Sequence, residues 1–535
     1  MKTNKELQNE VRRRRTFAII SHPDAGKTTL TEKLLLYGGA IRLAGSVKSR
    51  KAQRHAVSDW MEIEKQRGIS VTSSVLQFEY NQFMINILDT PGHQDFSEDT
   101  YRTLMAADNA VMVIDCAKGV EEQTKKLFQV CKLRGIPVFT FINKMDRAGK
   151  DPFELLEEIE QVLGIDSYPM NWPIGTDGHF KGVYNRTKSQ MEIFEGGHHG
   201  QSQVSSITGN ATDQVFRDLL GDYLHEQFMN EIELLDEAGN RFDLKRVLKG
   251  ELTPVFFGSA MTNFGVQPFL ESFLELTLPP APRISEGKEI DPETEKFSGF
   301  IFKIQANMNP AHRDRIAFLR ICSGKFNKGM TAELSRDHKK VKLAQPQQFF
   351  AQDRSTVEAA YPGDIIGIHD PGIFRIGDTL SEQSTGIVYE DIPVFAPEHF
   401  AKISAKDSMK RKQFIKGIKQ LSEEGAIQVF RPMNSGIEEI IVGVVGVLQF
   451  EVLEYRLMRE YNVEIRQQTF PYRHVRWIEM PGFDPERFQL TMDSIIALDN
   501  DDQPVIMFQN DWTEERVIER NKGVKLNNIS KRPVK

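Results

Sequence analysis

Cysteine and long apolar runs are both scarce in this sequence of 535 residues. The three cysteines, Cys116, Cys131 and Cys322, are odd in number and lack metal-ligand spacing. This argues against a disulfide framework and favours reduced core thiols in a cytoplasmic protein. No run approaches the ~18 apolar residues that cross a bilayer, and no secretory signal is expected at the N-terminus. We therefore expect no membrane partner.

A basic excess is also absent, because 68 lysines and arginines face 75 aspartates and glutamates, for a net charge of −7. Whole-surface attraction to nucleic acid is therefore not expected, and DNA is not an expected partner. Any RNA contact must come from local patches. The basic run at residues 12–15 could contact phosphates, but a solvated helix leading into the first strand is the favoured interpretation.

The length predicts three or four domains, since one hydrophobic core supports at most about 250–300 residues. With 40% hydrophobic and 27% charged residues, the composition is that of a folded globular protein.

A phosphate-binding loop is predicted at residues 21–28, between an apolar run at 17–20 and a helix-like run at 30–36. In such a loop backbone N–H groups cradle phosphates, a lysine reaches the β and γ phosphates, and the next hydroxyl ligates Mg²⁺. Ser21 replaces the usual first glycine, and a small residue can still make the turn. A chance Gly-Lys-Thr at a helix start is the alternative.

The residues assigned to this loop are Ser21, His22, Pro23, Asp24, Ala25, Gly26, Lys27, Thr28 and Thr29. Among them, Lys27 and Asp24 are counted as catalytic, and Thr28 is assigned as a metal ligand.

A nucleotide-sensing switch is predicted between residues 42 and 70, where the chain has too little apolar content to be fixed by packing alone. The hydroxyl of Ser70 can ligate Mg²⁺ and its N–H can bind the γ-phosphate, which would order the segment only around a triphosphate. The alternative is a serine in a surface turn.

A second short sequence motif, or box, is Asp-Thr-Pro-Gly-His at residues 89–93. It follows the predicted strand 83–88, which pairs with a strand at 71–80. Asp89 is placed to hold Mg²⁺ through water, and Gly92 lets the backbone approach the γ-phosphate. Thr90 and Pro91 are counted as nucleotide contacts. His93 follows beside the site of the attacking water, which it would position or polarise. A lone histidine is more often structural, but its place in this box favours catalysis.

The nucleotide base that the site selects is predicted from a third box, which follows the predicted strand 136–142 and consists of Asn143, Lys144, Met145 and Asp146. A carboxylate at position 146 accepts hydrogen bonds from guanine N1–H and the exocyclic amine, whereas adenine offers no such donor pair. Asn143 would brace the loop, and the stem of Lys144 would lie over the purine.

The closing piece of the base site is expected at Ser259 and Ala260, after the strand 253–257. Backbone N–H groups here are available for guanine O6, and Ala260 leaves room for the base. Because the chain between the two guanine boxes is too long for one strand and helix, residues 173–252 are expected to contain an insertion. It is predicted to have strands at 182–185 and 190–194 and one amphipathic helix from 213 to 237. Two histidines at 198–199 are interpreted as part of an exposed loop, since ligand partners for a metal are missing.

Taken in order, the boxes at 24–33, 67–70, 89–93 and 143–146 resemble those of the translational GTPases. Strings at 34–41, 54–61 and 68–78 are most similar to the bacterial branch that acts in translation termination. The family usually has threonine at Ser70 and glycine or alanine at Ser21, and serine keeps the metal-binding hydroxyl. The resemblance implies a GTP hydrolase that is activated by the ribosome and binds GTP, GDP and Mg²⁺.

Within that branch, the implied role is to bind ribosomal RNA and proteins on terminating ribosomes and to eject class I release factors after peptide release. A monomer is expected. One alternative is an elongation-factor-G-like GTPase acting in translocation or ribosome rescue, although the chain has no obvious room for the two further domains of a translocase. Another is a GTP-gated ribosome-binding scaffold with little turnover.

The expected fold class is multidomain α/β. A P-loop GTPase domain at residues 1–282 has a mostly parallel sheet with helices on both faces. A β-barrel follows at 296–388, where short alternating segments are separated by glycine turns. Residues 395–535 begin in the order βαββαβ, which predicts a ferredoxin-like α+β domain, and continue as a C-terminal extension after about residue 467. The basic helix at 406–419 is either a patch for ribosomal RNA or a solvated face.

Overall fold

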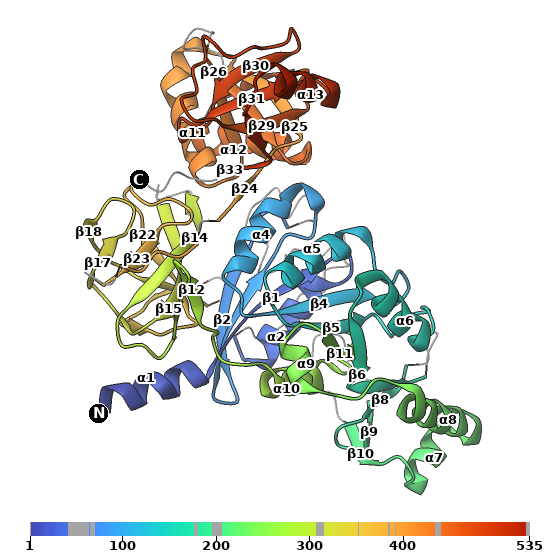
Figure 1. Cartoon of the computed structure of the whole chain (residues 1–535). Coiled ribbons are helices and arrows are strands. Elements are labelled where there is room, and N and C mark those ends of the chain that lie inside the picture. The colour runs from blue at the N-terminus through green and yellow to red at the C-terminus, as the bar shows by residue number, and fades with distance from the viewer. Residues whose placement is uncertain are drawn as a thin grey trace.

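The computed structural model describes residues 2–40, 64, 70–175, 180–194, 206–306, 315–350, 353–382, 386–390, 392–433 and 440–530. Figure 1 shows three folded units: an α/β unit in blue to green, a barrel in yellow, and a C-terminal α+β unit in orange and red. The first helix, α1 (Lys2–Arg12), extends beside the barrel. The predicted multidomain α/β fold class is confirmed.

The α/β unit is built on a seven-stranded sheet in the order β2, β3, β1, β4, β5, β11, β6. Neighbouring strands are parallel except for the antiparallel pair β2 and β3. The strands are β1 (Arg14–Ser21), β2 (Ser74–Tyr80), β3 (Phe83–Asp89), β4 (Asn109–Asp115), β5 (Val138–Asn143), β6 (Asp166–Pro169) and β11 (Leu252–Phe257). Parallel strands present their carboxyl ends at one edge, so the loops after β1, β3, β5 and β11 meet there.

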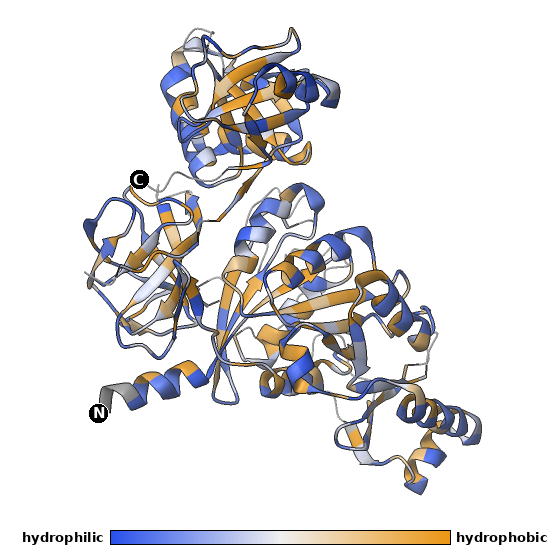
Figure 2. Cartoon of the chain, in the orientation of Figure 1, coloured by the Kyte–Doolittle hydropathy of each residue, from blue (hydrophilic) through white to orange (hydrophobic). Residues whose placement is uncertain are grey.

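Helices cover both faces of this sheet because side chains alternate along buried strands. Phe17 and Ile19 of β1 pack in one core with α2 and α10, whereas Ala18 and Ile20 pack in another with α4, α5 and α6. The helices are α2 (Lys27–Tyr37), α4 (Ser97–Met105), α5 (Glu122–Leu133), α6 (Pro152–Leu163), α9 (Leu244–Leu248) and α10 (Val266–Leu276). Figure 2 shows apolar strands at the centre and hydrophilic outer helix faces.

The predicted insertion contains a separate antiparallel sheet in the order β10, β9, β8, β7. Its strands are β7 (Asn171–Ile174), β8 (Gly182–Asn185), β9 (Gln190–Phe194) and β10 (Ser206–Asn210). The prediction of one long helix at 213–237 is wrong. Gly221, at φ 79° and ψ 156°, separates α7 (Gln214–Leu220) from α8 (Asp222–Ala238), because this backbone conformation cannot continue a helix. The histidines at 198–199 lie outside the described residues.

The barrel is an eight-stranded antiparallel sheet in the order β18, β17, β23, β14, β15, β22, β19, β20. Its strands are β14 (Ser298–Ala306), β15 (Arg315–Ser323), β17 (Thr331–Leu334), β18 (Lys339–Lys342), β19 (Gln347–Phe350), β20 (Asp353–Thr356), β22 (Ile365–His369) and β23 (Thr379–Ser381). Short pairs accompany it: β12 (Arg283–Ser285) with β13 (Lys288–Ile290), and β16 (Phe326–Asn327) with β21 (Ala359–Ala360).

The C-terminal unit has an eight-stranded sheet in the order β28, β25, β27, β26, β30, β31, β29, β32. Its first half has the predicted βαββαβ order, with α11 and α12 between the strands. These elements are β25 (His399–Ala405), η2 (Ser408–Lys410), α11 (Arg411–Glu423), β26 (Gln428–Pro432), β27 (Ile440–Val444), α12 (Leu448–Tyr461) and β28 (Ile465–Thr469). This half has its own core, which includes Phe414, Ile418, Leu453 and Leu457.

The extension after residue 467 is a folded second half rather than a loose tail. It continues the same sheet through the pairing of β26 with β30, and it has its own apolar clusters. Its elements are β29 (His474–Glu479), β30 (Ser494–Leu498), β31 (Pro504–Phe508), α13 (Asp511–Arg520), β32 (Lys525–Asn527) and β33 (Ile529–Ser530), the last pairing with β24 (Val394–Phe395). The basic tail at 531–535 lies outside the described residues.

The barrel covers polar side chains of the α/β sheet. The Thr16 hydroxyl and the Asn86 amide donate to the carbonyl oxygen of Gly363 at 2.6 and 3.3 Å, and the Gln77 amide donates to the carbonyl oxygen of Ile365 at 2.9 Å. All three side chains are fully buried. The barrel therefore both covers these side chains and supplies hydrogen-bond acceptors for them, which stabilises its contact with the sheet of the α/β unit.

Candidate functional site

The loop after β1 turns sharply into α2. Gly26 has φ 99° and Asp24 has φ 66°, both in the left-handed region. A Cβ on Gly26 would lie 2.2 Å from Nδ2 of Asn143, so glycine is required both for the backbone conformation and for the close approach. The Ser21 hydroxyl donates to the carbonyl oxygen of His22 at 2.9 Å, which accommodates a serine at the start of the turn.

Lys27 and Asp89 are brought together at the base of this loop. Their side chains are 6% and 2% exposed, and the Lys27 ammonium donates to Oδ1 of Asp89. The sequence assigned Lys27 to phosphate and Asp89 to Mg²⁺, and both groups lie where the loops after β1 and β3 meet. Thr28 and Thr29 occupy the first turn of α2 and are partly exposed.

Other loop residues take up supporting positions. Nε2 of His22 lies 3.4 Å from Glu121, and Asp24 is exposed. The Thr90 hydroxyl is fully buried and donates to the carbonyl oxygen of Ile19 at 2.7 Å. The expectation that Thr90 contacts the nucleotide is therefore not met by its side chain, which instead joins β3 to β1.

Of the predicted switch, only Glu64 and Ser70 are described. Residues 41–63 and 65–69 lie outside the described residues, and Ser70 is partly buried just before β2. The segment that follows Ser70 is strongly held: Oε1 of Glu64 accepts from the N–H groups of Val71 and Thr72 at 2.9 and 3.0 Å. These contacts set the point at which the switch joins the sheet.

His93 begins the short helix η1 (Gln94–Phe96) immediately after Gly92. A Cβ on Gly92 would lie 3.5 Å from Cα of Pro23, so the two loops run side by side. Nδ1 of His93 accepts from the N–H of Asp95 at 3.2 Å, and 34% of the side chain is exposed. In the neutral ring this hydrogen bond places the proton on Nε2.

The guanine loop is joined to the phosphate loop by Asn143. Its Nδ2 donates to the carbonyl oxygen of Ala25 at 2.9 Å, and its Oδ1 accepts from the N–H of Ala260 at 2.9 Å. The Ser259 hydroxyl donates to Oδ1 of Asp146 at 2.5 Å, which orients that partly exposed carboxylate. Three of the predicted boxes therefore converge at the carboxyl edge of the sheet.

Two residues of the guanine loop differ from expectation. The Met145 side chain is 3% exposed and belongs to the apolar core, so it cannot contact a base. The Lys144 ammonium donates to the carbonyl oxygen of Asp24 and lies 2.5 Å from Oδ2 of Asp115. Lys144 therefore also ties the guanine loop to the phosphate loop, a role that sequence reasoning missed.

The N–H groups assigned to guanine O6 already donate within the protein. The N–H of Ser259 donates to Phe264 at 2.9 Å, and that of Ala260 donates to Asn143. Guanine O6 would have to share the Ala260 N–H with Asn143.

Asp115 and Asp95 are site residues that the sequence analysis did not single out. Asp115 ends the buried strand β4 and fixes Lys144. A carboxylate at the carboxyl end of a parallel strand was the signal that could have identified it. Asp95 could not have been found in this way, because its partner Leu448 is distant in the sequence.

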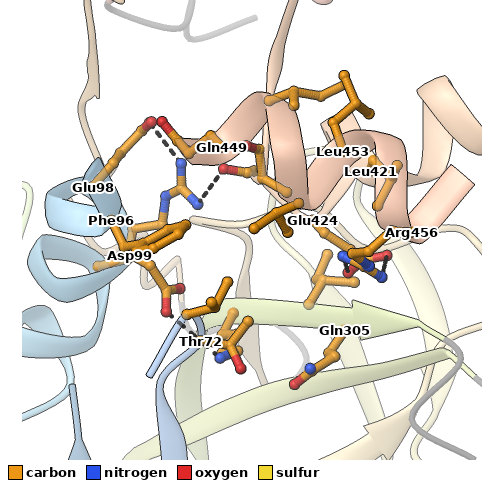
Figure 3. A pocket seen from close by; sticks show the side chains of 18 residues that line it. Thr72, Phe96, Glu98, Asp99, Gln305, Leu421, Glu424, Gln449, Leu453 and Arg456 are labelled. Carbon is orange, nitrogen blue, oxygen red and sulfur yellow. Dashed lines mark hydrogen bonds and ion pairs between the residues drawn. The ribbon is translucent and has the colours of Figure 1, made fainter. Parts of the chain in front are cut away.

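A buried polar junction lies behind the end of the switch, where the three units meet (Figure 3). Oδ2 of Asp99 accepts from the Ser73 N–H at 2.7 Å and lies 3.7 Å from the Lys303 ammonium, which donates to the Ser73 carbonyl oxygen. Burial raises the pKa of Asp99, but Lys303 and the Ser73 hydrogen bonds outweigh it and hold that pKa below its usual range. Burial also lowers the pKa of Lys303.

The ligand set for a metal is chemically suitable for Mg²⁺. Thr28, Ser70 and Asp89 offer hydroxyl and carboxylate oxygens, the hard donors that Mg²⁺ takes together with substrate phosphates. The part of the chain that is described contains no cluster of three or more His, Cys, Asp or Glu side chains able to hold a metal without such a substrate. Among the same residues, no helix has the length and apolar character needed to cross a bilayer.

Comparison with protein families assigns three consecutive regions. Residues 12–279 match the elongation factor Tu GTP binding domain, residues 296–383 match elongation factor G domain 2, and residues 389–518 match the C-terminal domain of class II release factor RF3. In fold, the chain is similar to a crystal structure of a Thermus thermophilus protein, with a TM-score of 0.68 and 22% identity over 91% of this chain and 72% of that one.

Curated relatives match over almost the whole chain. A peptide chain release factor 3 of Symbiobacterium thermophilum is 60% identical, covering 97% of this chain and 98% of the relative. Those of Trichodesmium erythraeum and Gloeobacter violaceus are each 53% identical, with 97 to 99% of every chain covered. The chain belongs to the peptide chain release factor 3 family of translational GTPases, enzymes that hydrolyse GTP.

Proposed function

We propose that this GTPase acts on terminating ribosomes in the cytoplasm, where ribosome-stimulated GTP hydrolysis drives class I release factors off after peptide release. It works as a monomer whose partners are ribosomal RNA, ribosomal proteins and the class I factor. The names of the relatives and the match to the release factor C-terminal domain support this role. The proposed domains are residues 1–282, with an insertion at about 173–252, then 296–388 and 395–535.

The observation that supports the proposal is the convergence of three segments: Asn143 and Lys144 join the guanine loop to the phosphate loop, and the Lys27–Asp89 pair joins the phosphate loop to the 89–93 box. Backbone N–H groups of residues 24–26 and the N-terminus of α2 bind the phosphates. Lys27 neutralises the β and γ phosphate charge. Asp146, oriented by Ser259, selects guanine by accepting its two donors.

His93 is the proposed catalytic residue. Its Nδ1 is occupied by the Asp95 N–H, so Nε2 is the atom left to position or polarise the attacking water, while Gly92 brings the backbone to the γ-phosphate. Thr28, Ser70 and Asp89 hold Mg²⁺, which when bound neutralises phosphate charge and orients the β and γ phosphates.

The test of catalysis is His93→Ala, with His338→Ala as the matched control, because His338 is 82% exposed on the distant barrel. General acid–base or positioning groups contribute about 10²–10⁴-fold to rate. We expect His93→Ala to lose at least 100-fold in ribosome-stimulated single-turnover hydrolysis while its Kd for GTP changes less than threefold. Wild-type turnover in His93→Ala would assign the catalytic role to another residue.

The test of the cellular role is release-factor recycling on stalled termination complexes. We expect the wild-type protein with GTP to accelerate dissociation of a bound class I factor, and His93→Ala to remain limited to a single round. Stimulated translocation with no effect on the class I factor would favour the elongation-factor-G-like alternative. GTP-dependent ribosome binding with no turnover would favour a scaffold.

A further inference from the structure

The carboxylate of Asp95 lies between the proposed catalytic histidine and the C-terminal unit. Oδ1 is 3.3 Å from Nδ1 of His93, and Oδ2 accepts from the N–H of Leu448 at 2.8 Å. The same residue donates its own N–H to Nδ1 of His93. Asp95 is nearly buried, so these partners fix both its main chain and its side chain.

The partner side of this contact is rigidly built. Leu448 is the first residue of α12, whose first N–H groups have no partner within the helix, and Asp95 satisfies one of them from another unit. Oε1 of Gln449 accepts from the N–H groups of Val445 and Gly446 at 2.8 and 3.1 Å. Gln449 also donates to the carbonyl oxygen of Ala426 at 3.1 Å, which anchors this turn to the loop before β26.

Gly446 is required for the close approach. A Cβ at this position would lie 2.0 Å from Cγ of Asp95 and 2.4 Å from both carboxylate oxygens. A side chain there must displace either the Asp95 carboxylate or the whole N-terminus of α12. The φ of Gly446 is not in the left-handed region, so a substitution would act through this contact and not through backbone strain.

Apolar side chains pack next to the contact between Asp95 and Leu448. Phe96, the residue after Asp95, packs in one cluster with Val71 at the end of the switch and Val452 of α12. Figure 3 shows Phe96, Gln449 and Leu453 among the residues that line the junction. The docking of α12 is therefore built against the residues that follow His93.

We propose that Asp95 is a positioning residue that makes the orientation of the His93 ring depend on the docking of α12. The inference rests on the proposed role of His93 in hydrolysis. When α12 is docked, Leu448 holds the Asp95 carboxylate, which fixes the η1 turn, and the N–H of Asp95 holds Nδ1 of the ring. When α12 moves away, the carboxylate loses this partner, the η1 turn is no longer fixed, and its N–H no longer holds the ring in one orientation. GTP hydrolysis is thereby coupled to the position of the C-terminal unit.

The decisive variant is Gly446→Ala, which lies outside the α/β unit and leaves every nucleotide-binding residue intact. We expect its ribosome-stimulated kcat for GTP to fall at least 10-fold, with its Kd for GTP and GDP and its ribosome KM within threefold of wild type. Val447→Ala is the matched control, because Val447 is the neighbouring residue and its side chain is exposed. It should retain wild-type kcat.

Variants of Asp95 test the same contact from the α/β unit. Asp95→Asn keeps an oxygen that can accept from Leu448, whereas Asp95→Ala does not. We expect Asp95→Ala to lose at least 10-fold in kcat and Asp95→Asn to stay within threefold of wild type, with melting temperatures within a few degrees for both.

The inference is overturned if Gly446→Ala retains wild-type kcat, or if Asp95→Asn is as slow as Asp95→Ala. His93→Ala, measured in the same assay, separates this failure from failure of the proposed function. If His93→Ala is inactive while Gly446→Ala is fully active, only the coupling is wrong. If His93→Ala is fully active, the proposed catalytic role fails and the coupling fails with it.

Discussion

The amide of Asn143 donates a hydrogen bond to the carbonyl oxygen of Ala25 at 2.9 Å, so a guanine-loop side chain supports the phosphate loop. The contact is buried, and its geometry leaves no space for a side chain at Gly26. The two halves of the nucleotide site therefore cannot be altered independently at this point.

Asn143→Ala should consequently weaken the binding of GTP and of GDP alike. The substitution leaves the Ala25 carbonyl oxygen and the Ala260 N–H without their partner, at about 1–3 kcal/mol for each buried group. We expect both nucleotide affinities to fall by about 30-fold or more, equivalent to about 2 kcal/mol. Isothermal titration calorimetry with each nucleotide checks this, and a loss confined to GTP would contradict it.

Asp146→Asn should change base preference instead of overall affinity. An amide in place of the carboxylate cannot accept from both guanine donors, but it can donate to the additional oxygen of xanthine. We expect competition experiments to show a shift from GTP toward xanthosine triphosphate. Ser259→Ala is the control, because it removes only the hydrogen bond that orients Asp146. It should weaken GTP binding without changing the preference for guanine. Unaltered guanine preference in Asp146→Asn would refute the assigned pairing.

Lys303→Met should loosen the strand that follows the switch. The substitution leaves the buried Asp99 carboxylate and the Ser73 carbonyl oxygen without their cation, and breaking a buried charge pair costs about 3–5 kcal/mol. We expect faster amide hydrogen exchange over residues 71–76 and a melting temperature several degrees lower. Lys339→Met, at a lysine that is 72% exposed on the barrel, should do neither. Unchanged exchange over 71–76 would show that the barrel does not hold this strand.

All three cysteines should be unreactive until the chain unfolds. Burial raises the pKa of Cys116 and of Cys131 to about 12 from 9.0, and it also raises that of Cys322. At pH 8 the thiolate fraction of Cys116 or Cys131 is therefore about 1000-fold smaller than that of a free thiol. We expect Ellman's reagent to detect no thiol in the native protein and three in urea.

The same pKa shifts make the free energy of unfolding depend on pH. A raised native pKa means that the folded chain keeps thiol protons that the unfolded chain loses, so the stabilisation is complete below pH 9 and declines as pH rises toward 12. Each thiol contributes a slope of about 1.4 kcal/mol per pH unit within this window. A double Cys116→Ser, Cys131→Ser variant should show a shallower fall in denaturation midpoint between pH 9 and 10.5. Equal slopes would contradict this.

The parts of the site that could be predicted from sequence are those fixed by local chemistry. Gly26 and Lys27 follow a strand and open a helix, so their conformation is set by neighbours in the chain. The same holds for Asp89 and Asn143 at strand ends. The alternating core of β1 likewise follows from a pattern of period two.

The parts that could not be predicted depend on distant partners. The sequence assigned the stem of Lys144 to the purine but gave no partner for its ammonium. The ammonium lies against Asp115, and only the packing of β4 beside β5 brings them together. The Asp95 carboxylate meets α12, from another unit. The residues after 467 were predicted only as a C-terminal extension. Their elements could not be assigned because these short strands complete a sheet that begins with β25 and β26.

Gln77 and Asn86 of the α/β sheet find their carbonyl partners at Ile365 and Gly363, in the barrel. During synthesis from the N-terminus, all seven strands of that sheet are made before those carbonyl groups have left the exit tunnel. A nascent chain at this stage leaves these polar side chains open to water, because the barrel that covers them has not yet been made. Its α/β unit reaches full stability only when the barrel emerges and docks, so truncation before residue 363 should yield a less stable fragment.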